Sequence, residues 1–166
     1  AREQNLENAE TPESMEICFI ADNNYKRFLS EYLPEQISKI GDGNIIDESG
    51  TKLGKHTGFT DYTIGQRKGL GLSFPEPRYV KEIDAKNNTI VVGKKESLFS
   101  LSCNVVSMNW LVDNPKLLEN IECQIRYNSQ PVDCNILENN EIISVHFKEP
   151  QLAVTPGQSI VFYKNK

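Results

Sequence analysis

The chain has 166 residues, of which 38% are hydrophobic and 25% are charged. This length and composition allow a hydrophobic core in one ordinary domain or two small ones, and they exclude a chain that is disordered throughout. No run of about 18 apolar residues exists to span a bilayer, and the polar, acidic residues 1–16 do not resemble a signal peptide. The sequence therefore predicts a soluble protein.

The net charge of −5 is distributed unevenly. Residues 51–81 carry six basic and two acidic side chains, a net charge of +4 that leaves −9 for the remainder. Binding to nucleic acid depends on clustered Lys and Arg more than on total charge. This basic window is a candidate nucleic-acid contact, and a solvated surface of mixed charge is the alternative.

The four cysteines, Cys18, Cys103, Cys123 and Cys134, show neither the C-x-x-C pairs of a zinc site nor the dense spacing of a secreted disulfide scaffold. They predict a reducing, cytoplasmic compartment and no metal site. The last three are predicted to be structural, since no ligand pattern accompanies them.

The first predicted elements follow a polar leader, residues 1–13, which is either flexible or the stub of a larger domain. A short apolar run, Ile17–Ile20, has the pattern of a buried strand end. Asp22–Asn24 can then cap a helix that Pro34 stops. The apolar stripe of this helix falls at i, i+3, i+4, i+7 and i+8: Tyr25, Phe28, Leu29, Tyr32 and Leu33.

Strands and turns are predicted next. Asn44–Asp47 is a strand followed by a turn at residues 48–50, and the stretch Gly54–Gly71 contains five glycines, which favours a loop that brings backbone close to a ligand. Arg78–Asp84 and Thr89–Gly93 flank a turn and predict a hairpin.

The last third is predicted to be almost entirely β. Residues alternate between apolar and polar along Ile121–Tyr127 and again on the two strands that follow, so that Cys123 and Cys134 face a core. A turn at Thr155–Gln158 leads into a final strand, Ser159–Tyr163. Five or six short strands in about 70 residues predict a small closed barrel.

Three blocks of sequence carry a family resemblance. The first is S-M-E-I-C-F-I at 14–20 with Y-K-R-F-L at 25–29; the second is L-G-K-H-T-G at 53–58 with Y-T-I-G-Q-R-K-G-L-G at 62–71; the third is I-R-Y at 125–127 with A-V-T-P-G-Q-S-I-V-F-Y at 153–163. In this order and spacing they resemble the signatures of the tRNA 2-thiouridylase (MnmA/TrmU) family. The second block is the most specific, because so many fixed residues in a row rarely arise by chance.

The resemblance implies an ATP-dependent tRNA-uridine 2-sulfurtransferase that forms 2-thiouridine at the wobble position. Such enzymes begin with an ATP pyrophosphatase domain that carries an S-G-G-x-D-S phosphate loop and a first cysteine, and neither is found in this chain. We therefore expect a C-terminal fragment that is inactive alone, with the site for ATP and its expected Mg²⁺ in the missing domain.

The resemblance also implies a fold, α+β to mainly β, in three parts. Residues 1–35 would be the tail of the ATP pyrophosphatase domain with Cys18 and one helix, residues 36–96 a small central β-rich domain, and residues 97–166 a β-barrel like that of translation factors.

For the site residues, the resemblance makes Cys18 the catalytic cysteine whose persulfide delivers sulfur, supplied by a sulfur-donor protein, to C2 of the uridine. From its sequence context alone Cys18 would be a packed core thiol. The resemblance also makes Arg126, Tyr127 and Gln158 contacts to tRNA, although the alternation places Tyr127 on the inner face unless the strand ends near it.

The loop residues Gln66, Arg67 and Lys68 combine donors, charge and exposed backbone, which suits RNA contact as well as it suits a tight structural turn. A general-base or RNA-contact role is also open to His56, although a single loop histidine more often has neither role.

Two other functions stay open. One is an RNA-binding or translation-factor-like module without chemistry, in which Cys18 is simply buried. The other is a sulfur-carrier adaptor that hands its persulfide to another protein. A methyltransferase is not supported, because no glycine motif for S-adenosylmethionine is present.

Overall fold

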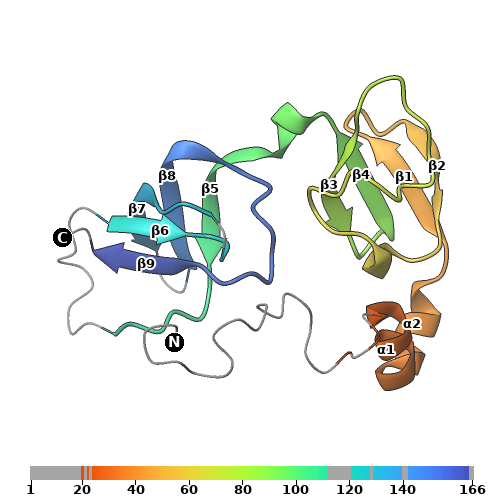
Figure 1. The fold of residues 1–166 in the computed structure, drawn as a ribbon, viewed down its shortest axis with the longest axis horizontal. Helices are drawn as coiled ribbons and strands as arrows, with labels where there is room; N and C mark the ends of the chain where they lie inside the picture. Colours follow the sequence, from red (N-terminus) through yellow and green to blue (C-terminus); the bar gives the residue numbers. More distant parts are fainter. Residues whose placement is uncertain are drawn as a thin grey trace, which may run out of the picture. The chain divides into compact units, whose positions relative to one another are not determined.

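The computed structural model describes residues 20, 22, 24–111, 121–127, 129–139 and 142–164. The chain divides into two compact units, residues 1–41 and 42–166, of which the first contains the helices and the second two β-sheets (Figure 1). The predicted α+β, mainly β fold is confirmed. No helix in the described residues is long and apolar enough to cross a membrane.

The first unit holds two short helices, α1 (Tyr25–Tyr32) and α2 (Pro34–Ile40). Asn24 caps α1, because its side-chain oxygen accepts a hydrogen bond from the Arg27 backbone N–H at 3.0 Å. Pro34 ends α1 as predicted, but it also begins α2, which the sequence analysis did not predict. Proline is tolerated at the first position of a helix, since the N–H that it lacks would have no partner there.

A four-stranded sheet begins the second unit, with strand order β2-β1-β4-β3 (Figure 1). Its strands are β1 (Gly43–Asp47), β2 (Lys52–His56), β3 (Tyr79–Asp84) and β4 (Thr89–Gly93). The predicted hairpin of β3 and β4 is confirmed, and β1 pairs with β4 in parallel. The prediction of a loop from Gly54 was wrong at its start, since Gly54 and His56 lie within β2 and pair with β1.

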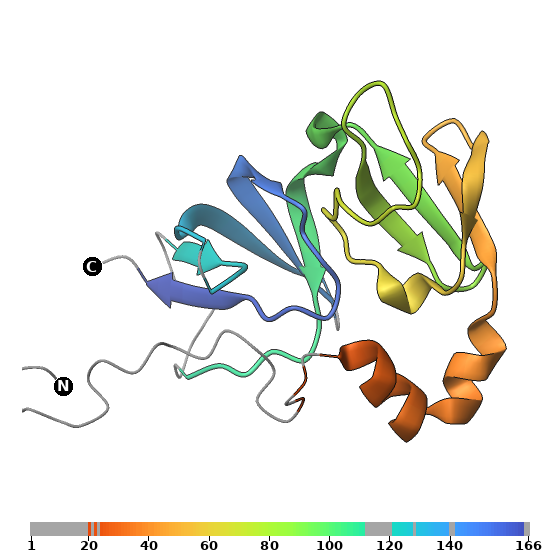
Figure 2. The same cartoon turned by 45° about the vertical axis from the view of Figure 1, so that its right-hand side comes forward.

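The segment from residue 57 to 78 connects β2 to β3 and packs on this sheet (Figure 2). It contains a short 3-10 helix, η2 (Phe59–Asp61), and otherwise has no regular structure. Its Leu70 is buried together with sheet residues, and other apolar side chains of the segment join them: Phe59, Tyr62, Leu72 and Phe74. The glycine-rich segment therefore covers the core of the four-stranded sheet with its apolar side chains and leaves the polar end of its loop exposed.

After a 3-10 helix, η3 (Lys95–Leu98), the chain forms a five-stranded antiparallel sheet of strand order β5-β8-β7-β6-β9 (Figure 1). The strands are β5 (Phe99–Val105), β6 (Ile121–Gln124), β7 (Val132–Asn139), β8 (Ile142–Leu152) and β9 (Val161–Lys164). Cys103 and Val105 on one edge strand pack on the same core as Phe162 on the other. The sheet is thus curved like a barrel, but the prediction of a closed barrel was wrong for the described residues, since the edge strands β5 and β9 do not pair.

The predicted inward faces of this sheet are confirmed. Cys123, Cys134 and Val145 are each less than 5% exposed, and they share one core with Phe147. The prediction for the end of β6 was wrong, because the strand stops at Gln124 and not at Tyr127.

Candidate nucleic-acid interface

The turn after β6 presents two of the predicted RNA contacts. Arg126 is exposed, and Tyr127 is 77% exposed because the strand has ended before it. The Gln124 side-chain amide donates to the backbone oxygens of Tyr127 and Ser129, both at 2.8 Å. These bonds hold Tyr127 and Ser129 close to the end of β6.

A second turn, Thr155–Gln158, lies beside the first. Nη2 of Arg126 donates a hydrogen bond to the Ala153 backbone oxygen at 2.6 Å and lies 3.4 Å from Oγ1 of Thr155. The Gln158 backbone N–H donates to Thr155 O at 3.4 Å and closes the turn, which leaves the Gln158 side chain exposed. Arg126 and Gln158, which are 32 residues apart in sequence, thus belong to one surface.

The glycine-rich segment reaches the same place. A Cβ atom added to Gly65 would lie 3.2 Å from the Cβ of Ala153, so this loop and the Ala153 methyl group are close to each other. The loop is tied to β3 by two backbone hydrogen bonds, Gly65 N–H to Val80 O at 2.8 Å and Val80 N–H to Gln66 O at 2.9 Å. All three predicted RNA-contact segments therefore meet around Ala153.

The side chains of this loop have different roles. Gln66 accepts a hydrogen bond from Thr63 N–H and donates one to Lys68 O, both at 2.9 Å, so its amide braces the loop from within. Arg67 and Lys68 are exposed, and neither side chain makes a hydrogen bond or ion pair with any described residue. Two positive charges are thus available to a ligand at the tip.

His56 lies in the core and not in the loop tip. It is 3% exposed, its Nδ1 accepts a hydrogen bond from Gly58 N–H at 3.2 Å, and its Nε2 lies 3.2 Å from Asn88 O. Because Nδ1 accepts, Nε2 can donate to Asn88 O. Both nitrogens serve the fold, which gives His56 a structural role.

The three cysteines of the five-stranded sheet are packed core thiols. Burial raises the pKa of the Cys123 thiol far above its usual range, with the neighbouring Cys134 adding to the shift. Burial also raises the pKa of the Cys134 thiol and of the half-buried Cys103 thiol. The thiolate is the reactive form, so these groups are poor nucleophiles at neutral pH.

This gives a prediction for thiol chemistry. At pH 8, iodoacetamide should modify Cys123 and Cys134 at least about 100-fold more slowly than a free cysteine, because thiolate fraction and access both fall with burial. Intact mass and peptide mapping over time would measure the rates, with the urea-unfolded chain as the control in which the difference disappears. Fast labelling of Cys123 in the folded chain would contradict it.

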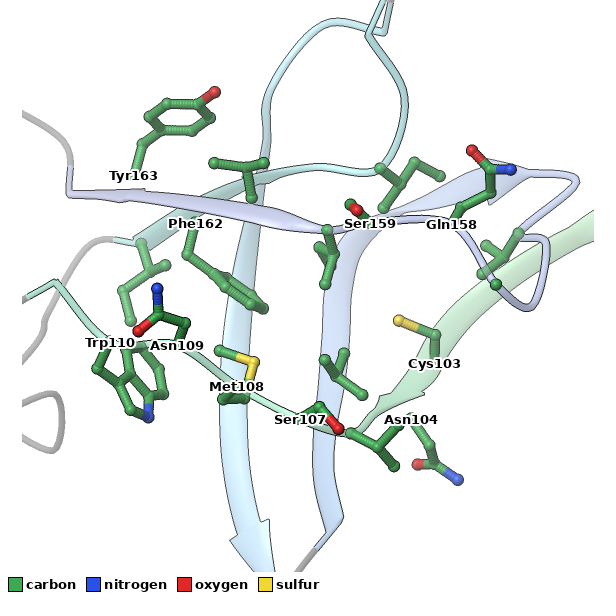
Figure 3. A pocket seen from close by; sticks show the side chains of 18 of the residues that line it. Cys103, Asn104, Ser107, Met108, Asn109, Trp110, Gln158, Ser159, Phe162 and Tyr163 are labelled. Atoms are coloured by element: carbon green, nitrogen blue, oxygen red, sulfur yellow. The ribbon is translucent and has the colours of Figure 1, made fainter. Parts of the chain in front are cut away.

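A cavity of about 850 Å³ lies between β5, with the residues after it, and the segment from residue 154 to 164 (Figure 3). Met108, Phe162 and the Cys103 sulfur point into it, whereas Gln158 and Tyr163 point away. The inward side chains are apolar, and Trp110 stacks on Phe162 with ring centroids 6.2 Å apart. The cavity thus lies on the core side of the curved sheet, and Gln158 faces away from it.

Cys18, the predicted catalytic residue, lies outside the described residues. Among the residues that are described, no group of three or more His, Cys, Asp or Glu side chains could hold a metal ion.

Comparisons with known proteins give a family match for the region of each sheet. Residues 26–94 match the family model described as the tRNA methyl transferase PRC-barrel domain, and residues 100–166 match the one described as the aminomethyltransferase beta-barrel domain. These two matches cover the four-stranded and the five-stranded sheet, respectively.

Curated relatives agree with each other in name. A "tRNA-specific 2-thiouridylase MnmA" of Carboxydothermus hydrogenoformans is 42% identical over 99% of this chain and 45% of its own length. Proteins of the same name from Geotalea uraniireducens and Natranaerobius thermophilus are 42% and 43% identical over 93% and 99% of this chain, and 41% and 45% of their own lengths. The chain therefore belongs to the tRNA-specific 2-thiouridylase family, and it spans a little less than half the length of these relatives.

Proposed function

We propose that this chain is the RNA-binding and sulfur-delivering part of a tRNA-uridine 2-sulfurtransferase that forms 2-thiouridine at the wobble position. The observation that carries the proposal is the meeting of three segments, with Arg126, Gln158 and the Arg67–Lys68 tip, around Ala153 in a member of this family. A sulfurtransferase for tRNA needs such a grip, because the wobble base must be held unstacked while it reacts.

The chemistry of each segment suits RNA. Arg67, Lys68 and Arg126 offer positive charge to phosphates, and the guanidinium of Arg126 keeps donors available beyond the Nη2 bond to Ala153. Tyr127, at 77% exposure, presents a ring on which an unpaired base can stack. Gln158 adds a side-chain amide, whereas Gln66 supports the loop from within and is assigned no direct RNA contact.

Cys18 would deliver the sulfur. The thiolate of Cys18 takes the outer sulfur of a donor persulfide and releases the donor as a thiolate. The terminal sulfur then attacks C2 of the uridine as the activated C2 oxygen leaves. A second cysteine, outside this chain, finally attacks the Cys18 sulfur, which forms a disulfide and frees the C2–S⁻ product.

Activation of the C2 oxygen is the step that we assign to ATP. It converts a poor leaving group into a good one by adenylation. We assign this step to a part of the family's length that this chain does not span. The partners that follow are tRNA, an ATP pyrophosphatase domain and a protein sulfur donor.

We retain a three-part division of the chain in this proposal. Residues 1–35 would continue the ATP pyrophosphatase domain, residues 36–96 would form the central domain, and residues 97–166 would form the barrel. The RNA would lie across the last two parts.

Arg126 gives the first test of the RNA grip. Arg126→Ala should weaken tRNA binding by about 1–3 kcal/mol, the scale of a charge-assisted hydrogen bond. Filter binding or fluorescence anisotropy at low salt would measure it. Lys148→Ala is a matched control, because it removes one positive charge from an exposed ion pair with Asp133 on the same sheet. Equal weakening by both substitutions would reject a specific contact.

The function itself is tested by binding and by sulfur loading. The 166-residue chain should bind a tRNA with a wobble uridine more tightly than a homopolymer of equal length, and a persulfide donor should add one sulfur atom selectively to Cys18. RNA binding without selective loading would instead indicate a binding module, and failure of both would reject the proposal.

A further inference from the structure

The backbone at Ala153 is unusual for the residue that it carries. Its φ is +51°, in the left-handed region, and its side chain is 3% exposed. An L-residue with a Cβ adopts this conformation at a cost of roughly 1–2 kcal/mol, which glycine avoids. A strained residue in a well-packed place is a reason to look for a role that depends on its side chain.

Ala153 connects four separate stretches of chain. Its N–H donates to Leu98 O at 2.9 Å, which extends the pairing of β5 with β8. Its carbonyl oxygen accepts from Arg126 Nη2 at 2.6 Å and from Thr155 Oγ1 at 2.9 Å. Its methyl group lies against Gly65, at the base of the loop that carries Arg67 and Lys68.

We propose that Ala153 is a positioning residue for RNA binding. Its carbonyl oxygen accepts a hydrogen bond from the Arg126 guanidinium, and its methyl group positions the loop at Gly65. Arg126 and the loop side chains Arg67 and Lys68 can therefore contact one RNA backbone together. This inference rests on the proposed function and adds a residue to which no RNA contact is assigned.

The dimensions agree with joint contact. Arg67 follows Gly65 by two residues, so their Cα atoms are at most about 8 Å apart. Arg126 donates a hydrogen bond directly to Ala153 O. The charges therefore lie within the reach of neighbouring phosphates, and each phosphate contact should add to the salt dependence of binding.

A pair of glycines provides a matched test. Gly65 has φ +87° and would meet Ala153 through an added Cβ, whereas Gly50 has φ +85° and would meet nothing within 4 Å. Alanine at either position has a similar backbone cost, but only Gly65→Ala pushes against Ala153. Ala153→Gly removes the opposing methyl group and suits the positive φ.

Binding of tRNA should separate these variants. Gly65→Ala should weaken tRNA affinity on the order of tenfold. It should also reduce the magnitude of the slope of log K against log [salt] by about one to two, because Arg67 and Lys68 no longer contact RNA phosphates. Gly50→Ala should leave both unchanged. Adding Ala153→Gly to Gly65→Ala should restore most of the affinity and the slope.

Two results would overturn the inference: equal binding by the Gly65→Ala and Gly50→Ala chains, or a double variant as weak as Gly65→Ala. Hydrogen exchange gives a readout without RNA, since the N–H of residue 153 should lose protection, relative to its intrinsic exchange rate, in Gly65→Ala and regain it in the double variant. If the unaltered chain bound no tRNA, the proposed function would fail, whereas the exchange result would still report on the seating of the loop.

Discussion

Cys18→Ser should abolish formation of 2-thiouridine, with a loss of roughly 1,000-fold or more, the scale seen when a nucleophile is removed from an enzyme. A serine hydroxyl cannot carry the sulfane sulfur, so neither loading nor delivery can proceed. The assay combines the chain with the ATP-dependent domain of a family member, a persulfide donor and tRNA, and it measures thiolated nucleoside by mass spectrometry.

The same substitution should leave tRNA affinity nearly unchanged, because oxygen for sulfur alters one atom and no charge at the RNA grip. Cys123→Ser is the matched control. It makes the same atomic change in the buried core of the five-stranded sheet, where it should lower stability without removing activity from the chain that remains folded. A large loss of affinity in Cys18→Ser would show that Cys18 supports RNA binding and not sulfur transfer.

The assay also distinguishes the other candidate functions. A module without chemistry would bind tRNA equally well with and without the Cys18→Ser substitution, and it would add nothing to the activity of the separate ATP-dependent domain. A sulfur-carrier adaptor would accept sulfur on Cys18 and pass it to a protein thiol, so that labelled sulfur would appear on the partner and not on RNA.

The sequence predicted those parts of the fold in which local signals agree with packing. The alternation in β7 and β8 placed Cys134, Val145 and Phe147 inside, and all three are buried. Asn24 was correctly placed at the helix start, since capping depends on residues adjacent in sequence. Helix α2 was missed because Pro34 stops one helix and begins another with the same ring geometry.

Long-range relations could not be predicted from these local signals. The parallel pairing of β1 with β4 joins strands that are far apart in sequence, and no periodicity records it. The alternation that placed Tyr127 inside assumed that β6 continues, but the Gln124 amide and Ser129 form a turn there. Ala153 has an ordinary sequence signal, and only the three-dimensional structure shows that Arg126 and Gly65 both contact it.

Gly43→Ala should be among the most destabilising single changes in the four-stranded sheet, at about 3 kcal/mol of unfolding free energy, the upper end of the usual cost of overpacking. A Cβ at Gly43 would overlap Asn88 O and the ring of His56. Asn88 O is a backbone atom that also accepts from Asn44 N–H at 3.2 Å, so it cannot move without breaking the sheet. Urea unfolding followed by circular dichroism would measure the change.

Gly50→Ala separates overlap from backbone strain. Gly50 lies in the turn between β1 and β2 with φ +85°, and an added Cβ there would meet nothing within 4 Å, so only the left-handed cost of roughly 1 kcal/mol applies. The excess in Gly43→Ala then measures how tightly His56 and Asn88 are packed against β1. If the two variants unfolded at the same urea concentration, the His56 ring would have room to move away from an added Cβ. The buried position of His56, with hydrogen-bond partners for both ring nitrogens, would then not be needed to hold β1 beside β2.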